Sequence, residues 1–177
     1  GKIDRPWAHG LAVGPDQVLV ANASELAILT PSGLGRRWPM PERAVGVRPI
    51  GAGGGFVVAT THGAFRFGLA EDAPTALPAP HLDPFEQVSE ALLHEGTLYL
   101  STDRGRLLAL DPDSGQQHHA TTLGVSGRIE LGPAESGLVA LTPDGVLRRF
   151  DSALAPVQSL WLGSVHQLAS ERALMYS

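Results

Sequence analysis

The chain contains no cysteine among its 177 residues, which excludes disulfide bonds, thiolate metal sites and cysteine nucleophiles. It also lacks a basic surplus, since 13 Lys and Arg stand against 18 Asp and Glu for a net charge of −5. A protein that neutralises nucleic-acid phosphates needs many cations, so we predict no nucleic-acid partner. The apolar runs last only a few residues, far short of the roughly 20 that span a bilayer. We therefore predict no membrane insertion.

Charged residues are also scarce, at 18%, whereas hydrophobic residues reach 43%. This balance is too apolar for a disordered chain, so the sequence predicts a folded protein. Glycine and proline are abundant instead, with 21 and 14 residues. Because both residue types favour turns over long regular elements, the fold is expected to contain many short elements joined by turns.

A pattern repeats four times along the chain with a period of about 40 residues. Each copy starts with a strand-like segment, at residues 18–22, 56–60, 98–102 and 138–142. A tight turn and a second strand-like segment follow, and the turn positions are Ser24, Gly63, Gly105 and Gly145. We predict Gly63, Gly105 and Gly145 to be structural turn residues. At Gly105 and Gly145, which follow turn-forming Asp residues, a hairpin would require positive φ.

Each copy also carries a first apolar segment upstream, at residues 9–13, 47–50, 90–93 and 128–131. Three copies have a weaker fourth segment, around residues 37–38, 118–123 and 157–162. Four short strands in about 40 residues are typical of one β-propeller blade. The sequence therefore predicts an all-β fold, a β-propeller of four-stranded antiparallel blades, with about four blades and the start of a fifth.

We expect residues 1–177 to form a single propeller domain or a partial propeller. The predicted blades cover residues 6–44, 45–85, 86–125 and 126–164, and a partial blade covers residues 165–177. The strand-like segments at 165–168 and 173–177 start this fifth unit but do not complete it. Three hypotheses remain open: a fragment of a larger propeller completed by further sequence, a small closed ring, or self-association with another copy or a partner chain.

Two blades resemble known propeller families. Residues 96–115, which read GTLYLSTDRGRLLALDPDSG, resemble the repeat of quinoprotein-like (PQQ-like) propellers. Residues 9–22, with their HGLAVGPD start, are similar to NHL-type and gluconolactonase-like blades. In the quinoprotein pattern a Trp usually stands where this chain has His119. This departure argues against a bound quinone, and we predict no cofactor.

Most catalytic motifs are missing. The glycine cluster at residues 51–55 precedes a strand and opens no helix, so it does not match a dinucleotide-binding loop. Lys2 is the only lysine, which excludes a lysine-bearing phosphate loop. No Gly-x-Ser-x-Gly nucleophile elbow is present. The histidines show no spacing typical of a metal site; they are His9, His62, His81, His94, His118, His119 and His166.

One enzymatic alternative follows from the gluconolactonase-like resemblance. Such a propeller would hold a calcium-type ion at the mouth of its channel through carboxylate and amide side chains from several blades. Glu90, Glu130 and Asn22 are the candidates here, although no spacing selects them. A metal-assisted hydrolase of the lactonase type therefore stays an alternative hypothesis, while the sequence itself identifies no catalytic and no metal-binding residue.

The strongest binding candidates occupy one position of the repeat, at or just before the innermost strand of each blade. These residues would line the central channel or its rim, and they are His9, Arg48, Glu90, Arg128 and His166. Mixed charge at a channel suits a polar or peptide ligand, although the same residues would also suit a solvated rim.

Three tryptophans, Trp7, Trp38 and Trp161, are the other binding candidates. Exposed Trp side chains often anchor interfaces and sugar sites. Trp38 and Trp161 fall in the outermost strand of their blades, where packing between blades is the interpretation we favour. A small-ligand or sugar-binding propeller is thus a second alternative.

The absence of a convincing catalytic set favours a non-enzymatic function. We predict a propeller scaffold or recognition module that binds a protein or peptide partner through its rim or channel face.

Overall fold

The computed structural model describes residues 9–14, 16–50 and 55–163. This part of the chain forms sixteen strands and no helix, so it contains no helix that could cross a membrane. The strands form four antiparallel sheets of four strands each, in which chain neighbours are also sheet neighbours. The predicted all-β fold with four-stranded antiparallel sheets is confirmed.

We name the sheets blades 1 to 4. Blade 1 comprises β1 (His9–Gly14), β2 (Gln17–Ala21), β3 (Glu25–Thr30) and β4 (Gly33–Pro39). Blade 2 comprises β5 (Ala44–Ile50), β6 (Gly55–Thr60), β7 (Ala64–Gly68) and β8 (Thr75–Ala76). Blade 3 comprises β9 (Val88–His94), β10 (Thr97–Thr102), β11 (Arg106–Leu110) and β12 (Gln117–Thr122). Blade 4 comprises β13 (Glu130–Pro133), β14 (Leu138–Leu141), β15 (Val146–Phe150) and β16 (Pro156–Trp161).

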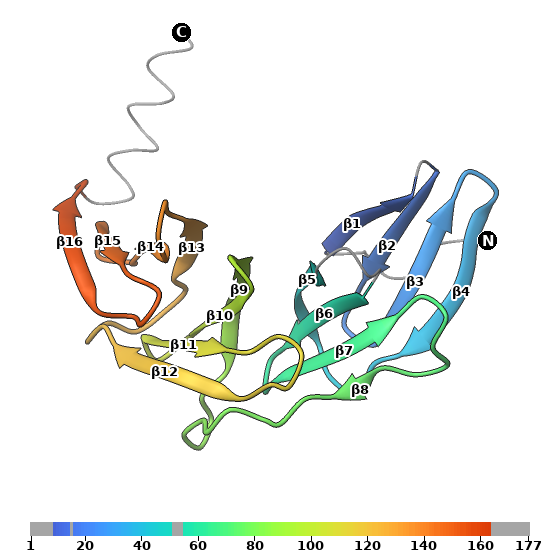
Figure 1. Ribbon diagram of the computed structural model, residues 1–177, viewed down its shortest axis with the longest axis horizontal. Coiled ribbons are helices and arrows are strands. Elements are labelled where there is room, and N and C mark those ends of the chain that lie inside the picture. The colour runs from blue at the N-terminus through green and yellow to red at the C-terminus, as the bar shows by residue number, and fades with distance from the viewer. Residues whose placement is uncertain (1–8, 15, 51–54, 164–177) are drawn as a thin grey trace, which may run out of the picture.

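The blades follow one another along an open arc (Figure 1). Their first strands contact in succession, β1 with β5, β5 with β9 and β9 with β13, and lie on the concave side of the arc (Figure 1). Blades 1 and 4 are at opposite ends (Figure 1). The predicted partial blade at residues 165–177 lies outside the described residues.

The two hairpins predicted at Gly105 and Gly145 are present. Gly105 joins β10 to β11 with φ of 79°, and Gly145 joins β14 to β15 with φ of 78°. Both values lie in the left-handed region that glycine adopts without steric cost. Gly63 lies in the connection from β6 to β7, where its carbonyl accepts a hydrogen bond from the Thr60 amide at 2.8 Å. Its φ is not positive, so this turn does not require glycine for its backbone conformation.

The hydrophobic core consists of three clusters, one between each pair of neighbouring blades. Alternate residues of a strand point to opposite faces of its sheet, so one strand supplies two clusters. In β10, Leu98 and Leu100 pack toward blade 2, whereas Tyr99 packs toward blade 4. Burial of both faces explains why these strands are nearly continuous hydrophobic runs. Packing between blades therefore stabilises the fold.

A proline-rich segment follows blade 2, whose fourth strand β8 has only two residues. Prolines 78, 80 and 84 interrupt the connection from β8 to β9, and proline cannot donate to a β ladder. This connection positions Glu86, which is fully buried. One Glu86 carboxylate oxygen accepts hydrogen bonds from Arg106 Nη1 at 2.9 Å and from the Asp83 amide at 2.8 Å. The buried ion pair thus ties the connection to blade 3.

The pKa of Glu86 lies below its ordinary value. Burial raises this pKa, but hydrogen bonds from Thr102, Asp83 and Arg106, together with the Arg106 charge, lower it by more. A carboxyl group with a lower pKa in the folded state stabilises the fold above its unfolded pKa, about 4.3 for Glu. This contribution disappears as the pH falls through the folded pKa.

We expect Glu86→Gln to be less stable than the parent chain at pH 7 and to lose less stability on acidification between about pH 5 and pH 3. The free energy of unfolding, measured by urea denaturation across this range, checks the prediction. Glu135→Gln is the control, because Glu135 is exposed and should keep the parent profile. If the parent chain and Glu86→Gln gave parallel pH profiles, the prediction would be wrong. The folded state would then not stabilise the ionised form of Glu86.

Candidate functional site

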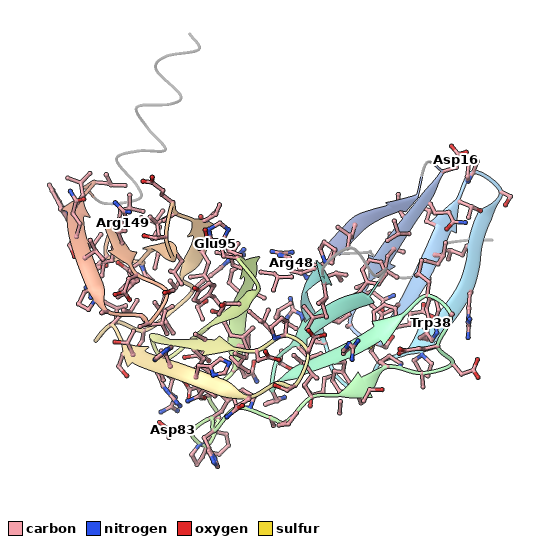
Figure 2. The ribbon with its side chains drawn as sticks, in the orientation of Figure 1. Asp16, Trp38, Arg48, Asp83, Glu95 and Arg149 are labelled. Carbon is pink, nitrogen blue, oxygen red and sulfur yellow. The ribbon has the colours of Figure 1, made fainter. Side chains whose placement is uncertain are left out.

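The first strands of the blades bring several predicted rim residues together. His9 starts β1, Arg48 lies in β5, Glu90 lies in β9, and Arg128 comes two residues before β13. Because these strands are neighbours on the concave side, their charged side chains meet across blade boundaries. Arg48 points to this side (Figure 2).

Arg48, Glu90 and Arg128 form what we call the charged row. Glu90 Oε2 accepts a hydrogen bond from Arg128 Nη2 at 3.1 Å. Glu90 Oε1 lies 3.8 Å from Arg48 Nη2. One carboxylate thus lies between two guanidinium groups from the blades on either side. The row carries a net charge of about +1, because arginine stays protonated at neutral pH.

The two arginines of the charged row differ in how firmly they are held. Arg48 also donates to the backbone oxygens of Ala91, at 2.7 Å, and Val47, at 2.9 Å, and its side chain is 35% exposed. Among the described residues Arg128 has a polar contact only with Glu90, and its side chain is 69% exposed. Arg48 therefore fixes the row to the sheet, whereas the Arg128 guanidinium can reorient to bind a ligand.

His9 lies at the blade 1 end of the row. Burial lowers its pKa below the ordinary histidine value, against the opposing effects of a hydrogen bond to the Ala44 backbone and the charge of Glu90. The charges of Arg48 and Arg43 lower it further. His9 is therefore mostly neutral at pH 7 and can serve as a polar neighbour of the row.

A hollow of about 380 Å³ adjoins the charged row, and its lining includes Arg128, Glu130 and Leu141. The remaining lining residues are Gly127, Thr142 and Pro143. Sequence reasoning selected Arg128 but did not predict the hollow. The residues that line the hollow come from two segments, one just before and at the start of β13 and the other at the end of β14 and just after it. Register between these strands is a property of the folded blade rather than of either segment alone.

Trp38 is not available to a ligand, which corrects its selection as a binding candidate. Its side chain is 1% exposed, and Nε1 donates to the Glu71 carbonyl oxygen at 2.9 Å. The Trp38 and Phe67 ring centroids lie 5.6 Å apart. Glu71 and Phe67 belong to the neighbouring blade 2 region, so Trp38 packs between blades, the interpretation favoured above.

The other tryptophans have different outcomes. Trp161 ends β16 and is 69% exposed, so the packing between blades favoured above for this residue is not found among the described residues. Trp161 stays a candidate contact residue in the outermost strand of blade 4. Trp7 and the fifth rim residue, His166, lie outside the described residues. Three of the five rim residues thus lie on neighbouring first strands, and a fourth, Arg128, lies two residues before the next one.

Two of the three candidate calcium ligands, Glu90 and Asn22, have other partners. Glu90 is held by the two arginines, and Asn22 Oδ1 accepts hydrogen bonds from the amides of Ser24, at 2.9 Å, and Glu25, at 3.0 Å. Within the described ranges, no group of three or more His, Asp or Glu residues is arranged to hold a metal ion. The contacts of Glu90 are those of ion pairing, and the contacts of Asn22 are those of turn formation.

Solved structures of other proteins resemble this fold, whereas sequence comparison finds no match. No family model and no curated protein matches this chain. A structure of BBS1N in complex with ARL6DN matches with a TM-score of 0.61 at 14% identity, over 82% of this chain and 49% of that chain. The structure of Chaetomium thermophilum Raptor matches with a TM-score of 0.72 at 14% identity, over 89% of this chain and 16% of that chain.

The fold is propeller-like. Four antiparallel four-stranded sheets and the likeness to BBS1N agree on this point. At 14% identity the likeness concerns the fold alone. The chain spans about half the length of the BBS1N chain and less than a fifth of the Raptor chain.

Proposed function

We propose that the chain is a non-enzymatic recognition module that binds a protein or peptide partner on the concave face of its propeller. The observation that carries this proposal is the charged row. Three neighbouring blades contribute to it, and it ends in a largely exposed arginine beside a hollow. Strands β5 and β9 hold Arg48 and Glu90 in place, which preorganises this part of the binding surface.

The charge of the row favours a partner segment with carboxylate groups. Glu90 offsets one of the two arginines, which leaves one positive charge for the ligand. A guanidinium group binds carboxylates through two parallel hydrogen bonds. Arg128 has further donors for a ligand, because in the described part of the chain it donates only to Glu90. An acidic peptide laid along the first strands would meet Arg128 and the adjoining hollow.

Known propellers offer a precedent for partner binding, since BBS1N was solved in complex with ARL6DN. We further propose that blade 3 belongs to the quinoprotein-like repeat type and blade 1 to the NHL-type, with no bound quinone. In the same proposal the chain is one propeller unit or part of a larger propeller, with blades at residues 6–44, 45–85, 86–125 and 126–164 and a partial blade at 165–177.

Substituting Arg128 tests the proposed binding face. The probe is a fluorescein-labelled peptide rich in glutamate, titrated with the protein and followed by fluorescence anisotropy at low salt. We expect the acidic peptide to bind the parent chain more tightly than a lysine-rich peptide of equal length. Arg128→Ala should weaken its binding about tenfold, or roughly 1.4 kcal/mol, while the melting temperature stays nearly unchanged, because exposed ion pairs contribute little stability.

Arg37→Ala is the matched control. Arg37 is also largely exposed and lies 3.5 Å from a glutamate, Glu25, but it belongs to the outermost strand of blade 1. This variant loses the same charge, so it should bind the acidic peptide like the parent chain. Equal losses in both variants would indicate non-specific charge attraction and would refute a binding site at the charged row.

A further inference from the structure

Blade 4 has one face packed on blade 3 and one face turned away from it. The second face, which we call the outer face of blade 4, includes the leucine row Leu141, Leu147 and Leu160, which pair across β14, β15 and β16. Val139 lies beside this row. Leu160 is 54% exposed, and the other three side chains are only partly buried. No described sheet lies on this side of blade 4 (Figure 1).

Equivalent residues in the other blades are fully buried. The repeat aligns Val139 with Leu19, Val57 and Tyr99, which are each at most 1% exposed. It aligns Leu147 with Leu26, Ala64 and Leu107, which are each at most 3% exposed. In blades 1 to 3 these positions pack against the blade that follows. The outer face of blade 4 therefore carries the residues of a blade-to-blade interface.

Arg149 gives independent evidence for a missing neighbour. Its Nε atom is buried and has no hydrogen-bond partner among the described residues. Arg149 pairs with Val139 as Arg66 pairs with Val57, so the two arginines are equivalent. Arg66 Nε lies 3.5 Å from Asp113 Oδ1 of the following blade. Arg149 (Figure 2) thus occupies a position where its counterpart meets a carboxylate of the next blade.

The surface is also hollowed as an interface would be. A hollow of about 150 Å³ lies between Val139, Leu147, Arg149, Gln158 and Leu160. The larger hollow beside Arg128 borders on the same face through Leu141. Side chains from a neighbouring sheet would fill these spaces.

We propose that residues 165–177 dock on the outer face of blade 4 as the first two strands of a fifth blade. The repeat aligns Ala173 and Met175 with Leu98 and Leu100, which pack in one cluster with Val57 and its neighbour Ala59. By this alignment Met175 covers Leu141, and Ala173 lies over Val139. In an antiparallel fifth blade, the turn at residues 169–172 would lie at the same end of the blade as the β13–β14 turn, next to Arg149. Glu171 in this turn would supply a carboxylate for the Arg149 guanidinium.

Crosslinking between engineered cysteines tests this docking. The native chain has no cysteine, so a bismaleimide that spans about 10 Å, the spacing of packed sheets, reacts with thiols only where they are introduced. The test variant carries Leu141→Cys and Met175→Cys. The control carries Leu141→Cys and Leu174→Cys, because Leu174 would point away from blade 4 in the proposed strand. Intact mass and peptide mapping separate crosslinks within one chain from crosslinks between chains.

We expect the test variant to form the intramolecular crosslink several-fold more than the control. Equal yields in the two variants, or no intramolecular crosslink, would overturn the proposal. Crosslinks mainly between chains would show that a second copy covers this face and would also overturn it. In the unmodified chain, hydrogen exchange provides a second readout: slow exchange of the amides at 173–176 supports a docked strand pair, and unprotected amides refute it. Neither readout depends on peptide binding at the charged row.

Discussion

Gly105→Ala is expected to lower the free energy of unfolding by about 3 to 5 kcal/mol, the sum of left-handed backbone strain and a steric clash. The φ of 79° at Gly105 is one that residues with a side chain rarely adopt. A Cβ atom there would also overlap the Val125 carbonyl oxygen and lie 3.0 Å from the Val125 carbonyl carbon. Relief would require the connection from blade 3 to blade 4 to move. Urea denaturation followed by circular dichroism measures the loss.

Gly63→Ala serves as the control at the equivalent turn of blade 2. Its φ is not positive, and the nearest atoms to an added Cβ, in Ala79 and Pro80, lie 3.9 Å away. We expect a change within about 0.5 kcal/mol. Similar losses of unfolding free energy in the two variants would contradict this account. They would show that any side chain at this turn of the repeat is destabilising, whether or not it meets Val125.

Trp38→Ala is expected to cost about 3 to 5 kcal/mol, as is typical when a buried Trp is truncated. The substitution empties the space between blades 1 and 2 and leaves the Glu71 carbonyl oxygen without the Trp38 Nε1 donor. It also removes the ring contact with Phe67. The midpoint of urea denaturation should fall accordingly.

Trp161→Ala is the matched control for this experiment, because Trp161 is 69% exposed at the end of β16. We expect its stability to stay within about 0.5 kcal/mol of the parent chain. A loss as large as that of Trp38→Ala would indicate that Trp161 is buried in solution, against another chain or another segment.

The blades were predictable because local and tertiary preferences agree in them. Short runs of apolar and β-branched residues are separated by turn residues, and Gly105 and Gly145 mark hairpins that need left-handed backbone. Strand limits were less predictable. The segment starting at Val47 is part of β5, which begins at Ala44 and continues through Gly46, a residue of low β propensity. The two-residue β8 left no recognisable pattern.

The candidate site was predictable in position but not in its interactions. Repeat alignment selected Arg48, Glu90 and Arg128 because equivalent residues of a propeller lie at equivalent places. Which guanidinium contacts which carboxylate oxygen depends on the stagger between neighbouring blades, and no single segment encodes it. The buried pair of Glu86 and Arg106 was missed altogether, because Glu86 lies in an irregular connection with no repeat to align.

The three separate core clusters have a consequence for cooperativity. Each cluster joins only two adjacent blades, so the chain behaves as a one-dimensional array with nearest-neighbour coupling. Blades 1 and 4 each have a single described neighbour, so local opening should cost least at these two ends. A ligand held by the charged row would bridge blades 2, 3 and 4 and would suppress the opening of blade 4 by linkage. Binding would then reduce local opening at the blade 4 end of the array and leave the shape of the array unchanged.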